Sequence, residues 1–138
     1  AQTTWSSAIG DAVFTTSTVS GKGTYRAQAN NPVFQDDGTA FSAIIQTEPI
    51  DMGSNKLKFF SQLDLIGDKQ STSGNTSISW SDDDYGSFST AVTVDMSVAP
   101  ARVFRLGSGR RRAFKITDAV NRPLRLEAMD ITYKEGTS

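Results

Sequence analysis

Three consecutive aspartates near the middle of the chain, Asp82, Asp83 and Asp84, form its densest group of candidate ligands. Asp82, Asp84 and Gly86 have the alternate spacing with which a calcium loop begins, because carboxylate oxygens suit Ca²⁺ and glycine allows a tight bend. A complete EF-hand loop would also need a late Glu and flanking helices, which the sequence lacks. The other interpretation is a structural hairpin whose Asp side chains accept hydrogen bonds from nearby backbone N–H groups. Paired carboxylates for glycoside hydrolysis are not expected, since adjacent residues on a strand point apart.

Arginines are concentrated in the last third of the chain. The group consists of Arg102, Arg105, Arg110, Arg111 and Arg112. Strand alternation predicts Arg110 and Arg112 on one face and Arg111 on the other. A guanidinium binds carboxylate or phosphate through two parallel hydrogen bonds. Three interpretations stay open: a solvated edge strand that charge keeps from pairing, a contact with a protein partner, and direct contact with DNA phosphates.

The composition excludes several kinds of chemistry. The 138-residue chain has neither Cys nor His, so disulfides and Cys/His zinc sites are ruled out. Ser–His–Asp and Cys–His catalytic groups are ruled out too, because no imidazole can act as base. We therefore expect a non-enzymatic protein without a cofactor. No apolar run is long enough to span a bilayer.

Charge is balanced overall but not along the chain. Residues 1–100 carry five basic and eleven acidic side chains, a net of −6, whereas residues 101–138 carry nine and four, a net of +5. A pI near 5.3 argues against a dedicated nucleic-acid binder. The split suggests that the acidic hairpin at 82–84 meets the basic segment at 102–112 in the next subunit of an assembly.

The hydrophobic pattern has period two, which is typical of strands. It is clearest in Lys56–Ile66, where Leu57, Phe59, Ser61, Leu63 and Leu65 are predicted to share the core-facing side. Near the end of the chain the alternating set slips by one residue, which predicts a β-bulge near Ala128–Met129.

Seven or eight short strands with polar turns predict an all-β fold, an antiparallel, jelly-roll-like β-sandwich. We expect a loosely patterned N-terminal segment over residues 1–40, the sandwich over residues 41–134 and a frayed tail over residues 135–138. Most aromatic side chains at strand period belong to a core. Trp5 is the exception, because its segment is polar, and it is a candidate contact residue.

Four segments resemble, in order, a family of tailed-phage structural proteins. Ile78–Ser89 (ISWSDDDYGSFS) resembles their Ser-Asp-Asp-Gly-Gly-x-Thr-Trp-Ser hairpin, which is related to the Asp-box hairpins of sialidase-like propellers. Asp84 and Tyr85 stand where that motif has Gly-Gly. Val103–Ile116 (VFRLGSGRRRAFKI) is similar to their arginine-rich hairpin. The remaining two segments are Ile50–Gly53, which resembles a bend, and Pro123–Ile131, which resembles the closing strand.

The resemblance covers residues 44–133 and is to the C-terminal module of packaged-DNA stabilisation and tail-hub proteins of short-tailed phages. It implies a non-enzymatic virion component at the head–tail junction or tail, in a ring with portal, tail or adaptor subunits. It brings no catalytic or cofactor residues. The alternative is a carbohydrate-binding module of a phage receptor-binding protein, which predicts an exposed Trp80 or Trp5 in a polar groove.

Overall fold

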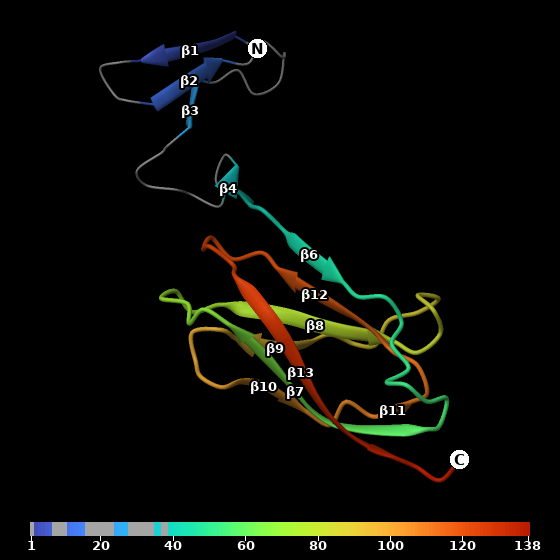
Figure 1. Ribbon diagram of the computed structural model, residues 1–138. Coiled ribbons are helices and arrows are strands. Elements are labelled where there is room, and N and C mark those ends of the chain that lie inside the picture. Colours follow the sequence, from blue (N-terminus) through green and yellow to red (C-terminus); the bar gives the residue numbers. More distant parts are fainter. Residues whose placement is uncertain (1, 7–10, 16–23, 28–34, 37–38) are drawn as a thin grey trace. The chain divides into compact units, whose positions relative to one another are not determined.

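A computed structural model describes the backbone of residues 2–6, 11–15, 24–27, 35–36 and 39–138, and the side chains of residues 39–138. The chain divides into two compact units, Ala1–Val33 and Phe34–Ser138. The described residues form strands and contain no helix (Figure 1). In that part of the chain, accordingly, nothing helical is long and apolar enough to cross a membrane.

The first unit contains one small antiparallel sheet. Its strands are β1 (Gln2–Ser6), β2 (Asp11–Thr15) and β3 (Thr24–Ala27), in the order β1-β2-β3. Trp5 lies in β1, opposite Ala12 of β2. The side chain of Trp5 lies outside the described residues, so its predicted contact role stays a prediction.

The second unit contains two four-stranded antiparallel sheets, which confirms the predicted all-β fold. One sheet has the order β6-β12-β8-β9. Its strands are β6 (Ala43–Gln46), β8 (Asn75–Ser81), β9 (Val92–Asp95) and β12 (Ala113–Asp118). In the other sheet, β7 pairs with β13 on one side and with β10 and β11 on the other. These strands are β7 (Lys58–Gly67), β10 (Ala101–Phe104), β11 (Ser108–Gly109) and β13 (Leu126–Glu135). A separate two-stranded pair consists of β4 (Gln35–Asp36) and β5 (Thr39–Ala40).

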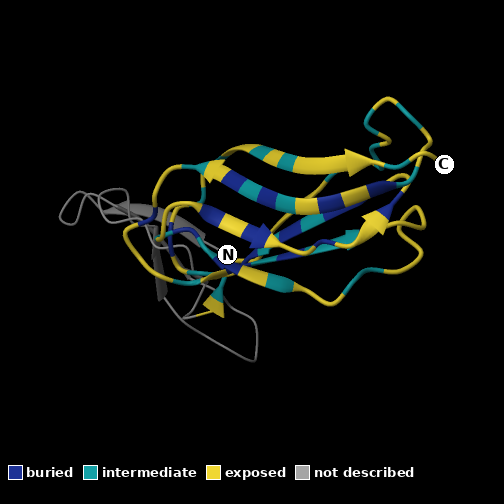
Figure 2. Ribbon diagram, turned by 90° about the horizontal axis from the view of Figure 1, so that it is seen from below, coloured by how far each residue is buried: buried dark blue, intermediate teal, exposed yellow. Residues whose placement is uncertain are grey.

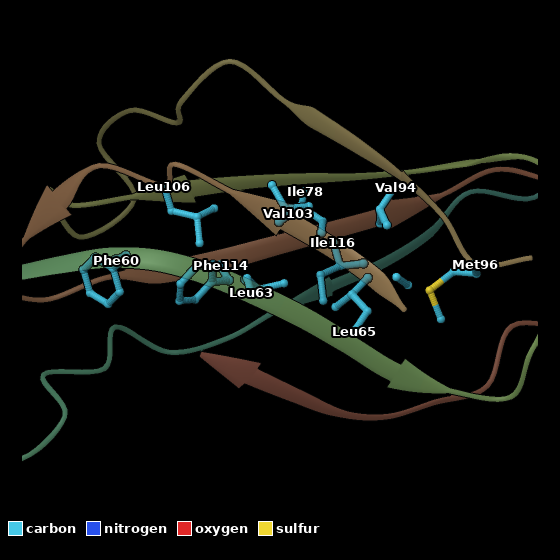
Figure 3. Close-up of a cluster of buried hydrophobic side chains, with 11 residues drawn as sticks. Phe60, Leu63, Leu65, Ile78, Val94, Met96, Val103, Leu106, Phe114 and Ile116 are labelled. Carbon is cyan, nitrogen blue, oxygen red and sulfur yellow. The ribbon is translucent and has the colours of Figure 1, made fainter. Parts of the chain in front are cut away.

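The hydrophobic core is built from inward-facing residues of both sheets (Figure 3). Its buried side chains are Phe60, Leu63, Leu65, Ile78, Val94, Met96, Ala101, Val103, Leu106, Phe114 and Ile116. Successive strand residues point to opposite faces, so buried and exposed positions alternate along β7 and β10 (Figure 2). Burial of this apolar surface is the main stabilising contribution to the sandwich.

The predicted inner face of β7 is correct at one end and wrong at the other. Leu63 and Leu65 are buried as expected, but Phe59 is 51% exposed, and Lys58 and Phe60 are buried instead. The cause is a β-bulge. Thr132 pairs with Gln62 and the next residue, Tyr133, pairs with Phe60, so Ser61 has no register partner on β13. One extra residue shifts the alternation, and every residue before Ser61 changes face.

A second irregularity lies close to the bulge that the sequence predicts near Ala128–Met129. Leu126 pairs with Gly67 and Ala128 pairs with Ile66, so Glu127 is the extra residue. This bulge lets Met129 and Ile131 pack partly against the core.

The C-terminal tail differs from the expectation that residues 135–138 fray. Strand β13 continues to Glu135. Beyond it, the Gly136 N–H donates to the Leu57 carbonyl at 2.7 Å, and the Leu57 N–H donates to the Ser138 carbonyl at 2.9 Å. These backbone hydrogen bonds hold the tail beside the start of β7.

Candidate functional site

The acidic hairpin and the arginine-rich segment meet inside one chain. Arg112 donates from Nε to Asp82 Oδ1 and from Nη2 to Asp82 Oδ2, both at 2.7 Å. This is the two-pronged geometry that makes arginine–carboxylate pairs strong. The Arg112 side chain is 1% exposed, whereas that of Asp82 is 36% exposed. The pair therefore closes one end of the sandwich, with the carboxylate on the solvent side.

The rest of the guanidinium is satisfied by backbone and aromatic groups. Its Nη1 donates to the Leu106 carbonyl at 2.6 Å, and its Nη2 also donates to the Ser108 carbonyl at 3.2 Å. The guanidinium carbon lies 4.2 Å from the ring centre of Phe60 and 5.2 Å from that of Trp80. A buried charge with this set of partners is tolerated, because hydrogen bonds replace its lost water.

The backbone on both sides of this pair is shaped to fit it. The Arg112 N–H donates to the Ile50 carbonyl at 3.0 Å and the Ile50 N–H donates to the Arg112 carbonyl at 2.9 Å. At Gly109, an added Cβ would lie 2.5 Å from Asp82 Oδ1. The glycine thus leaves room for the Asp82 carboxylate to reach the guanidinium.

Asp83 organises the turn that follows. Its carboxylate accepts from the Ser87 hydroxyl at 2.6 Å, from the Ser87 N–H at 2.8 Å and from the Ser81 hydroxyl at 2.7 Å. These hydrogen bonds, those from Ser87 first, lower the pKa of Asp83 to about 2. They match the expectation of a structural Asp-rich hairpin.

The residues that replace the family-like Gly-Gly adopt a glycine-like backbone. Asp84 has φ of 54° and Tyr85 has φ of 74°. The Tyr85 hydroxyl donates to the Thr47 carbonyl at 3.0 Å. This left-handed conformation is costly for a residue with a Cβ, and least so for Asp and Asn.

The three aspartates turn to three different sets of partners. Asp82 pairs with Arg112, and Asp83 accepts hydrogen bonds from two serines. Asp84 forms an exposed ion pair with Arg111, in which Asp84 Oδ1 lies 3.4 Å from Arg111 Nη2. Within residues 39–138 and the other described strands, no three acidic, His or Cys side chains converge as metal ligands. The arrangement of these side chains therefore gives no support to the interpretation of Asp82 and Asp84 as calcium ligands.

The predicted common face of Arg110 and Arg112 is wrong. Strand β11 ends at Gly109 and β12 begins at Ala113, so residues 110–112 do not alternate as a strand would. Arg110 is exposed and donates to the Asn55 carbonyl at 2.8 Å, while Arg112 points into the core. The Asp82–Arg112 and Asp84–Arg111 pairs form within one chain, and the pairing that we expected between subunits stays a prediction.

Two more arginines of the candidate group lie on the surface. Arg102 donates two hydrogen bonds to the Asp64 carboxylate, each of 2.7 Å. These hydrogen bonds lower the pKa of Asp64 and raise the pKa of Arg102. Arg105 is exposed, with φ of 61°. Arg105, Arg110 and Arg111 thus remain candidates for contact with a partner.

Sequence reasoning missed a second buried charge pair at the other end of the sandwich. Arg122 Nη2 donates to Asp118 Oδ1 at 2.8 Å and to Thr76 Oγ1 at 3.0 Å. The Thr76 hydroxyl donates to Asp118 at 2.8 Å. A signal was present, because Asp118 and Thr76 fall in the same alternation as the buried Ile116 and Ile78.

Lys58 is a further missed residue. Its ammonium group is fully buried and donates to three carbonyls, those of Ser54, Lys56 and Arg110. All three of its N–H donors are thereby used. Lys58 fastens the start of β7 to the arginine-rich segment.

A shallow pocket of about 290 Å³ opens beside the acidic hairpin. Its lining residues are Trp80, Asp82, Asp83, Ser87, Phe88 and Ser89. Trp80 is partly buried against the core, and Arg112 lies over its ring. The geometry is thus intermediate between the exposed Trp80 of a carbohydrate site and the buried Trp80 of a structural module.

Comparison with known proteins adds no relative: no protein-family model, no curated protein and no solved structure matches the chain.

Proposed function

We propose that the chain is a non-enzymatic structural component of a tailed-phage virion. It would act at the head–tail junction or in the tail, within a ring of subunits near the portal that helps to retain packaged DNA. Portal, tail or adaptor subunits would be its partners. The proposal originates in the four ordered motifs of residues 50–131 that resemble tail-hub and packaged-DNA stabilisation proteins.

The observation that carries the proposal is the contact between the two longest motifs. Asp82 belongs to the first motif, and Arg112 and Gly109 belong to the second. Asp82 and Arg112 form one bidentate ion pair at the end of the sandwich, and Gly109 leaves room for the Asp82 carboxylate. The residues behind the resemblance therefore share a structural task, which supports the role of a rigid module in an assembly.

Co-purification tests this proposal. The chain would be expressed with a tag alongside the portal, adaptor and tail proteins encoded in the same genome, and then captured. We expect retention of at least one of these proteins and ring-shaped particles in negative-stain electron microscopy. Capture of none of them, with each partner shown to be folded, would contradict the proposal.

Carbohydrate binding is the second candidate, and the pocket at Trp80 is the observation that favours it. Aromatic rings, carboxylates and hydroxyls together are groups that hold sugars. A glycan array with the whole chain, repeated with Phe88→Ala, discriminates the two functions. Binding that Phe88→Ala removes would support the carbohydrate site, whereas a blank array with successful ring assembly would support the virion role.

A further inference from the structure

The edge strand β6 is unpaired on one side and has unusual chemistry for an edge. It pairs with β12 and with no other described strand. All four of its residues, Ala43–Gln46, are exposed and none is charged. Ile44 is 58% exposed and Ile45 is 42% exposed. Charge, proline and bulges are the usual devices that keep edges from pairing, and β6 has none of them.

The other edges of the sandwich are protected. Strand β13 contains the bulge at Glu127, and its charged residues are Glu127, Asp130, Lys134 and Glu135. Strand β9 lies against β10 of the opposite sheet. At the remaining edge, β10 carries the charged Arg102 and β11 has only two residues. The open side of β6 is therefore distinctive among the described edges of the sandwich.

The direction of the free backbone groups follows from the register. The Thr47 N–H donates to the Phe114 carbonyl at 2.9 Å, and Ile45 pairs with Ile116. Backbone groups of an antiparallel strand alternate between its two sides. Since residues 45 and 47 use the β12 side, the N–H and C=O groups of Ile44 and Gln46 point to the open side.

We propose that β6 pairs with β6 of a second copy of this chain, antiparallel and centred on Ile45. In this register Ile44 of each copy faces Gln46 of the other, and all four free backbone groups at each edge find partners. Ile45 faces Ile45 across the two-fold axis as a close, non-hydrogen-bonded pair. The two four-stranded sheets thereby become one continuous sheet.

The charges near the edge agree with a second copy as the occupant. The nearest acidic residue on the strand's extension is Glu48, and the register places it opposite Ser42. The two Glu48 carboxylates of the dimer are therefore not opposed, and no buried charge is created. The contact closes on itself, so it adds a symmetric pairing to the ring contacts of the proposed function and does not depend on them.

Cysteine cross-linking tests the register, because the chain has no cysteine of its own. An Ile45→Cys variant places two thiols on opposite residues, within the Cα separation that a disulfide accepts. Gln46→Cys is the matched control. In this register the two copies of position 46 are offset from one another by two residues along the strands, about 8 Å apart and beyond disulfide reach. Val98→Cys, 60% exposed in a turn, measures random collision.

The whole chain would be oxidised mildly at about 100–300 µM, which populates a dimer whose Kd is of that order. We expect Ile45→Cys to form covalent dimer at least tenfold faster than either control. Equal rates for Ile45→Cys and Gln46→Cys would overturn the register. Dimer formation no faster than for Val98→Cys would overturn the pairing itself.

Sedimentation equilibrium provides an independent readout without oxidation. The unmodified chain should show a concentration-dependent monomer–dimer equilibrium. Ile45→Lys should weaken association at least tenfold, and Val98→Lys should leave it unchanged. Circular dichroism confirms that each variant is folded. A chain that stays monomeric over the whole range of protein concentrations would contradict the proposal. This holds even if a different virion protein pairs with the edge of β6.

Discussion

The ion pair between Asp82 and Arg112 leads to a quantitative prediction for Asp82→Asn. This substitution keeps the size of the side chain but removes its charge, and Arg112 stays 1% exposed with no carboxylate partner. Removing one member of a buried ion pair costs about 3–5 kcal/mol. Because Asp82 is 36% exposed, water can reach the vacated side, and we expect the lower end of this range.

Urea denaturation measures this loss. In a Trp5→Phe background, Trp80 becomes the single tryptophan. Its fluorescence reports on the Asp82–Arg112 pair, because Arg112 lies over its ring. With a urea dependence of about 2 kcal/mol per M, a loss of about 3 kcal/mol lowers the midpoint by roughly 1.5 M. Asp84→Asn is the matched control, because its pair with Arg111 is exposed on both sides and contributes less than about 1 kcal/mol. Equal midpoints for the two variants would refute the reasoning.

Predictions for four further substitutions concern the same hairpins. The pKa of Asp83 is lowered to about 2, so its hydrogen bonds stabilise the fold fully above the ordinary aspartate pKa of about 3.9, and this stabilisation is lost as pH falls through 2. The difference in melting temperature between the unmodified chain and Asp83→Asn should therefore be constant above about pH 5 and disappear only below about pH 2. Asp84→Gly should raise stability by up to about 1 kcal/mol in chemical denaturation, because glycine adopts φ of 54° without strain, and a loss would contradict the strain argument. Gly107→Ala should cost about 1–2 kcal/mol through its φ of 75° alone, with open space around the new methyl group. Gly109→Ala should cost more, because its Cβ meets Asp82, and the reverse order would argue against the close fit.

The sequence predicts the strand content well because alternation is a local property. Leu63 and Leu65 are buried as expected, and the slip near the end of the chain marks a real bulge. The bulge at Ser61 could not be predicted, because it depends on pairing with Thr132 and Tyr133, more than seventy residues away. The exposure of Phe59 and the burial of Lys58 follow from that one extra residue.

The candidate site is recovered only in part, for a similar reason. Residue type identifies Asp82 and Arg112 as charged groups, but nothing local says that they pair across 30 residues of sequence. Charged residues are mostly exposed, so a surface role is the natural expectation for Arg112. Asp118 and Thr76 show what signal can help: polar residues in phase with buried apolar ones predict a buried polar network.

Mass spectrometry of purified particles tests the central claim most directly. Phage particles produced from the genome that encodes this chain would be purified by density gradient, and their proteins would be quantified against the portal protein. The virion role predicts that the chain co-sediments with intact particles at a fixed ratio to the portal. Its absence from particles, while it is abundant in the particle-free fraction of the same culture, would contradict that role.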